Sequence, residues 1–204
     1  MATWQLAAKA RNDFADLVEG LTPDQWDHPS YCDEWTARGV LSHLTSFVET
    51  GVVGFMATMI KQRFDFNRVS VAMATQQLAR PVGDVILALR TKATKSAAMP
   101  MFREEMTVTD VAIHTQDVRR PLGLTGELDP AVLSTALEFL TTHKMATMLV
   151  DRKPLDGVRL VATDRDWSFG DGAEVAGTGE ALMMAMAGRP VLDELSGPGV
   201  DRWR

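Results

Sequence analysis

The sequence predicts a mainly α protein, in which an antiparallel helical bundle precedes a small α+β module. Two observations carry this prediction. Up to about residue 150, apolar residues recur three or four positions apart, which is the spacing that places them on one face of a helix. After Lys153-Pro154, apolar and polar residues alternate instead, as they do in a half-buried strand.

The N-terminal part of the chain contains two helices with a short helical turn between them. Residues 3–20 carry an apolar stripe and form the first predicted helix. Thr22-Pro23 then starts the turn, because threonine caps helices well and proline suits the first helical position. Thr36 is predicted to cap the next long helix, whose apolar face covers residues 40–48.

Three further helices are predicted from the same periodicity and from the positions of proline and glycine. In order, they span about 69–98 with a break near Pro81 and Gly83, about 107–121, and about 130–150 after the cap Asp129. Their connections suit an antiparallel bundle.

The module at the C-terminal end is predicted to combine short strands with one helix. The predicted strands are residues 157–163, 167–169 and 174–177, and the helix is 180–188. The methionines of that helix, Met183, Met184 and Met186, are interpreted as core filling, with an adaptable pocket as the alternative.

Composition limits the classes of function. The net charge of -6 disfavours a general nucleic-acid binder, which needs basic side chains to neutralise phosphates. No apolar run approaches the roughly 20 residues that span a bilayer. The single cysteine, Cys32, excludes an internal disulfide framework and fits a reducing compartment. We therefore expect a cytoplasmic protein without nucleic-acid or membrane partners, and the sequence leaves monomer and dimer open.

Three residues predict a metal site. Asp110 and His114 lie four positions apart and therefore share one face of a helix, and His43 lies beside the apolar face of an earlier helix. One carboxylate and two imidazoles suit zinc and leave a coordination position open. Asp117, one turn after His114, is the expected hydrogen-bond acceptor for an imidazole N–H.

Each of these residues has an alternative interpretation. His43 borders an apolar helix face, where a histidine is more often an ordinary core residue than a ligand. Asp110 closes a capping-box pattern that starts at Thr107. Asp117 has the alternative of a solvated carboxylate paired with Arg119 or Arg120. The remaining candidates are interpreted as not ligating: Cys32 as a small buried hydrophobe, and His28 and His143 as surface residues.

Three segments resemble one known family. The stretches LTPDQWDHPSYCDEWTARGVLSHLTSF and DVAIHTQDVRRPLG are similar to the two signatures of the mycothiol-dependent maleylpyruvate isomerase group, within the DinB-like superfamily. The stretch VRLVATDRDWSFGDGAEVAGTGEALMMAMAGRP resembles the small sterol carrier protein-like module of the same group. The stretch from about 50 to 105 carries no signature.

The resemblance implies a DinB-like metal-binding four-helix bundle over residues 1–128 and a small α+β module over residues 129–204. It implies a divalent metal, usually zinc with nickel as the alternative, held by His43, Asp110 and His114. The group generally has glutamate where this chain has Asp110, which is shorter by about 1.5 Å. Metal-ligand distances tolerate only roughly 0.2 Å, so the aspartate must be brought closer, bridged by water, or bind weakly.

The implied function is a metal-dependent and mycothiol-dependent isomerase or thiol transferase acting on a small electrophilic substrate. The metal-activated thiolate would be the nucleophile, and no catalytic side chain is assigned beyond the metal site. Two alternatives stay open: a non-catalytic ligand-binding bundle with weak or absent metal, and a hydrolase that uses metal-activated water. The sequence does not identify the substrate.

Overall fold

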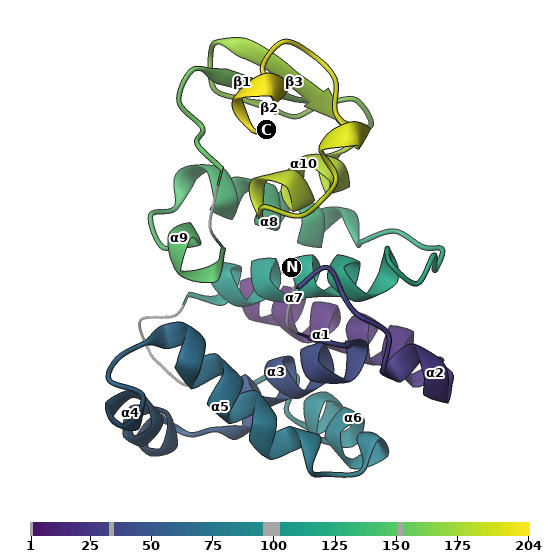
Figure 1. Ribbon diagram of the computed structural model, residues 1–204, viewed down its shortest axis with the longest axis vertical. Helices are drawn as coiled ribbons and strands as arrows, with labels where there is room; N and C mark the ends of the chain where they lie inside the picture. The colour runs from purple at the N-terminus through teal and green to yellow at the C-terminus, as the bar shows by residue number, and fades with distance from the viewer. Residues whose placement is uncertain (1, 33–34, 96–102, 151–152) are drawn as a thin grey trace. The chain divides into compact units, whose positions relative to one another are not determined.

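The computed structural model describes residues 2–32, 35–95, 103–150 and 153–204. The chain divides into two compact units, Met1–Thr125 and Gly126–Arg204 (Figure 1). The first is helical and the second combines helices with a small sheet, so the predicted fold class is confirmed. Within the described residues, no helix is both long and apolar enough to cross a lipid bilayer.

The first unit is a helical bundle. Its described helices are α1 (Thr3–Glu19), α2 (Pro23–Trp26), α3 (Ala37–Glu49), α4 (Val52–Lys61), α5 (Phe66–Leu78), α6 (Val82–Thr91) and α7 (Glu104–Arg119). Helix α1 packs along α7 and against α6, whereas α3 packs against α5 and α6 and also meets α7 (Figure 1). The contact between α3 and α7 matters for function, because these two helices carry the predicted metal ligands.

The start of α3 is fixed by the cap that the sequence predicts. The Thr36 hydroxyl accepts a hydrogen bond from the backbone N–H of Gly39 at 3.3 Å. Gly39 also leaves room for its neighbour, since a Cβ at this position would lie only 3.0 Å from the Cβ of Trp35. The Trp35 side chain can therefore lie directly against the first turn of α3, where it reaches the histidines described below.

Several predicted boundaries differ from the structure. The predicted break near Pro81 is confirmed, since it separates α5 from α6, but α6 ends at Thr91 and the helix after Asp129 ends at Thr142. Helix α4 was not predicted, because its apolar residues show no clear stripe and only Phe55 among them is buried. Helix α7 begins at Glu104, three residues earlier than expected. Asp110 therefore lies inside the helix, and the capping-box interpretation of this residue is wrong.

The second unit packs a three-stranded sheet with helices. Its helices are α8 (Pro130–Thr142), α9 (Ala146–Leu149) and α10 (Gly179–Met186), and its strands are β1 (Val158–Ala162), β2 (Ser168–Phe169) and β3 (Ala173–Gly177). The strand order is β2-β1-β3, with β1 antiparallel to β2 and parallel to β3. Asp129 caps α8, as predicted, through a hydrogen bond from Ala131 N–H. Met183, Met184 and Met186 are fully buried, as core filling requires.

Two leucines on α6 test the packing of the first unit. Leu89 is 0% exposed and Leu87 is 63% exposed, although they lie on the same helix. We expect Leu89→Ala to lower the free energy of unfolding by about 2–5 kcal/mol, because it removes buried methyl groups and leaves a cavity. Leu87→Ala is the matched control and should change it by less than about 0.5 kcal/mol. Urea unfolding followed by circular dichroism checks both, and equal effects would contradict the packing of α6.

Candidate metal centre

The structure brings the three predicted ligands together. His43 lies on α3, and Asp110 and His114 lie one turn apart on α7. The two histidines offer ring nitrogens and Asp110 a carboxylate oxygen, all within 4.8 Å of one another. The Asp110 carboxylate faces both rings, with Oδ2 at 3.5 Å from His43 Nε2 and Oδ1 at 3.5 Å from His114 Nε2.

These distances suit a shared cation. Two ligand atoms at about 2.05 Å from a tetrahedral zinc ion lie roughly 3.3 Å apart. The separations of 3.5 Å, from Asp110 Oδ2 to His43 Nε2 and from Asp110 Oδ1 to His114 Nε2, are close to this value. The shorter aspartate therefore reaches both imidazoles at this position of α7.

The second nitrogen of His114 is fixed by Asp117. The His114 Nδ1–H donates to Asp117 Oδ2 at 2.9 Å, and the Asp117 side chain is fully buried. Because a carboxylate only accepts hydrogen bonds, this contact keeps the ring proton on Nδ1 and leaves the Nε2 lone pair facing Asp110. Asp117 is not the solvated carboxylate of the alternative interpretation.

His43 has a different outer partner, which the sequence did not reveal. Its Nδ1 lies 2.8 Å from the hydroxyl oxygen of Ser70, a buried residue on α5. Its Nε2 is buried and has no hydrogen-bond partner among the described residues. No motif surrounds Ser70, and a serine on a helix gives no sign in the sequence that it will meet a histidine 27 positions away.

Aromatic rings surround the two imidazoles. The Trp35 ring centroid lies 4.4 Å from that of His43 and 6.0 Å from that of His114. Phe47 contacts His43 from another side, with its ring centroid at 5.0 Å. These rings limit the access of water to the facing nitrogens and thereby strengthen the electrostatic interactions between the site residues.

Burial and charge shift two pKa values in the site. Burial lowers the pKa of His43, so the neutral ring with an available lone pair is favoured. Burial by itself would raise the pKa of Asp110. The hydrogen bond and charge of the facing His43, followed by the charges of His114 and Arg11, outweigh burial, so the pKa of Asp110 is lowered. Arg11 is itself buried and donates to the carbonyl oxygens of Ala93 and Lys95 at 2.6 and 2.7 Å.

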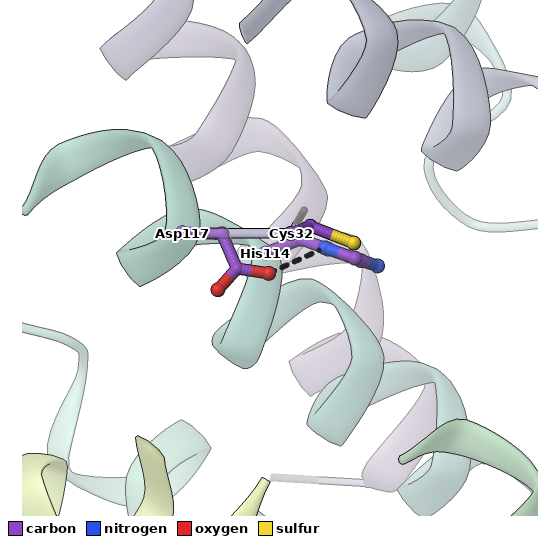
Figure 2. Close-up of side chains that lie close together, drawn as sticks. All are labelled: Cys32, His114 and Asp117. Atoms are coloured by element: carbon purple, nitrogen blue, oxygen red, sulfur yellow. Dashed lines mark hydrogen bonds and ion pairs between the residues drawn. The ribbon is translucent and has the colours of Figure 1, made fainter. Parts of the chain in front are cut away.

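Cys32 is half-buried and lies beside the same site, which corrects its interpretation as a small buried hydrophobe. Cys32, His114 and Asp117 form a second group whose ligand atoms lie within 4.8 Å of one another (Figure 2). The loop before α3 folds back onto α7, since the Tyr31 N–H donates to the Asp117 carbonyl at 3.0 Å. Cys32 therefore lies near His114, although 82 positions separate the two residues in the sequence.

The other two histidines lie outside the site. His28 is exposed, and His143 is half-buried in the second unit, where its ring stacks on Phe139 with centroids 4.8 Å apart. His143 is therefore a suitable control residue for tests of the site.

Comparison with known proteins identifies the family. The family profile described as the mycothiol maleylpyruvate isomerase N-terminal domain matches residues 7–142, about two thirds of the chain. The chain belongs to this family. The matched residues include His43, Asp110 and His114. Membership in this family supports the expectation that the chain is an enzyme.

The fold agrees with solved structures. Crystal structures of the mycothiol-dependent maleylpyruvate isomerase and of a histidine-to-alanine mutant each have a TM-score of 0.65 and 12% sequence identity to this chain. In both comparisons the aligned region covers 96% of this chain and 91% of the other. At this identity the similarity establishes a shared fold. No curated protein sequence matches the chain.

The lowered pKa of His43 predicts a pH dependence of stability for the metal-free protein. An unfolded histidine titrates near 6.5 and folded His43 titrates lower, so the unfolded state binds more protons between the two values. The free energy of unfolding should therefore be highest above about pH 6.5 and should fall as the pH drops below it. Urea unfolding at about pH 7.5 and about pH 5.5 with a chelator present measures this change.

The matched variants are His43→Gln and His143→Gln. The first should reduce the loss of stability between the two pH values, whereas the second should retain it, because His143 lies in the other unit. A loss of the same size in His43→Gln and in the wild type would show that His43 does not contribute.

Proposed function

We propose that this chain is a metal-dependent and mycothiol-dependent isomerase of a small electrophilic substrate, with the metal held by His43, Asp110 and His114. The observation that carries the proposal is the convergence of two imidazole Nε2 atoms on one carboxylate, in a member of the mycothiol maleylpyruvate isomerase family. The name of this family favours isomerisation over thiol transfer.

The donor set supports a divalent cation. With the Nδ1 proton of His114 committed to Asp117, its Nε2 is an acceptor, and the carboxylate of Asp110 also accepts only. The His43 Nε2 is buried without a hydrogen-bond partner among the described residues. Facing acceptors of this kind repel one another unless a proton or a metal ion lies between them, and a divalent metal satisfies all three at once. Two imidazoles and one carboxylate favour zinc, and nickel is the alternative.

The open coordination position gives the site its chemistry. A divalent metal held there would act as a Lewis acid that lowers the pKa of a thiol such as mycothiol and keeps it as a thiolate nucleophile. His43 and His114 provide neutral donors that leave net positive charge at the centre, and Asp110 balances part of it. Trp35 and Phe47 shield the rings from water, which favours a thiolate over competing hydroxide.

Metal content tests the ligand assignment. The wild type purified mildly should contain close to one equivalent of zinc or nickel, measured by inductively coupled plasma mass spectrometry. His114→Ala should contain less than about a tenth of an equivalent, because two ligands cannot hold the ion against dilution. His143→Ala should match the wild type. Equal metal content in these two variants, or a metal-free wild type, would contradict the assignment.

Thiol binding tests the function directly. Protein loaded with cobalt(II) should gain a sulfur-to-cobalt charge-transfer absorption when mycothiol is added, because the thiolate becomes a ligand of the metal. S-methylated mycothiol is the control and should produce no such band. A band that is present before mycothiol is added, and is lost in Cys32→Ser, would instead indicate the group of Cys32, His114 and Asp117. Bound cobalt that shows no sulfur band with mycothiol would contradict the proposed function.

A further inference from the structure

The two histidines of the site are held by chemically different partners. A carboxylate, Asp117, accepts from His114 Nδ1 at 2.9 Å, whereas a hydroxyl, Ser70, lies 2.8 Å from His43 Nδ1. All four side chains are buried. The difference matters because a carboxylate only accepts a hydrogen bond, but a hydroxyl either accepts or donates one.

Ser70 departs from the usual behaviour of a helical hydroxyl. Elsewhere in the first unit, three helical threonine hydroxyls donate to the carbonyl oxygen four residues earlier, at 2.7 Å in each of Thr75, Thr109 and Thr115. Ser70, on α5, instead pairs with the ring of His43 on α3. These two helices pack directly against each other, so the contact joins the first histidine to its neighbouring helix.

We propose that Ser70 is the positioning residue of His43, and that its hydroxyl allows this ring to change tautomer when a metal binds, while Asp117 keeps His114 in one tautomer throughout. The inference rests on the proposed metal site and concerns the step in which that site fills.

The geometry of Nε2 supports the change of tautomer. His43 Nε2 faces Asp110 Oδ2 at 3.5 Å, so a proton on Nε2 offsets the carboxylate charge while no metal is present. In that state the Ser70 hydroxyl donates to the free Nδ1. When a metal takes the Nε2 lone pair, the Nε2 proton leaves to solvent and Nδ1 takes up a proton from solvent, so the ring stays neutral, and the Nδ1–H then donates a hydrogen bond to the same hydroxyl. Ser70 thus satisfies Nδ1 in both states without moving, which a carboxylate could not do.

Zinc affinity gives the first test, measured by competition with a chromophoric chelator. Ser70→Ala should weaken zinc binding by about tenfold, and Ser70→Thr, which retains the hydroxyl, should restore most of it. Thr45→Val is the matched control. Thr45, on α3, is buried as Ser70 is, but its hydroxyl has no hydrogen-bond partner among the described residues. This control should bind zinc as the wild type does.

Nuclear magnetic resonance of the ¹⁵N-labelled imidazoles gives the second test, with a readout that a purely structural role for Ser70 would not change. His114 should carry its proton on Nδ1 in the metal-free and zinc-loaded protein alike. His43 should carry it on Nε2 without metal and on Nδ1 with zinc, and its metal-free signal should shift in Ser70→Ala but not in Thr45→Val.

The outcomes separate the two proposals. A wild type that binds no zinc overturns the metal site and this inference together. A wild type that binds zinc, while Ser70→Ala has unchanged affinity or His43 shows the same tautomer in both states, overturns the role of Ser70 alone and leaves the site in place.

Discussion

The first unit is organised around one electrostatic constraint: two imidazole nitrogens face a single carboxylate inside a helical bundle. Asp110 lies 3.5 Å from Nε2 of both His43 and His114, and the rings are almost fully buried. Such a group of acceptors is unfavourable away from water unless a proton or a metal lies between them. The packing of α3 against α7 brings the three groups together, so the fold itself creates a position that favours a proton or a cation.

The surroundings of this group are built to keep it in place. Asp117 determines the orientation of His114, Ser70 that of His43, and the indole of Trp35 lies against both rings. Gly39 permits that position of Trp35, because a Cβ there would lie only 3.0 Å from the Trp35 Cβ and would force the indole to shift. Catalytic sites gain from rigid supporting contacts of this kind, since ligands that are already oriented lose little freedom when the metal binds. The first turn of α3 therefore helps to hold the proposed ligands in place.

The sequence predicted the helical first part, the small sheet and the three facing residues, because each leaves a local pattern. Asp110 and His114 share a helix face through their spacing alone, and Thr36 marks the start of α3 by its capping chemistry. What it could not predict depends on tertiary packing. Ser70 lies on a helix without any motif and meets His43 only because α5 packs on α3. Cys32 precedes His114 by 82 positions, but the loop that carries it folds back onto α7. The capping-box pattern that starts at Thr107 also gave a wrong prediction, since Asp110 lies in the helix interior and not in its first turn.

The central claim is that His43, Asp110 and His114 jointly bind one metal ion. Diffraction from crystals of the zinc-loaded protein, recorded on both sides of the zinc absorption edge, locates the ion independently of any assumed ligand. We expect one anomalous peak at about 2.0–2.2 Å from Nε2 of each histidine and from an Asp110 oxygen. A peak coordinated by Cys32, His114 and Asp117, or no peak near the two Nε2 atoms, would contradict it.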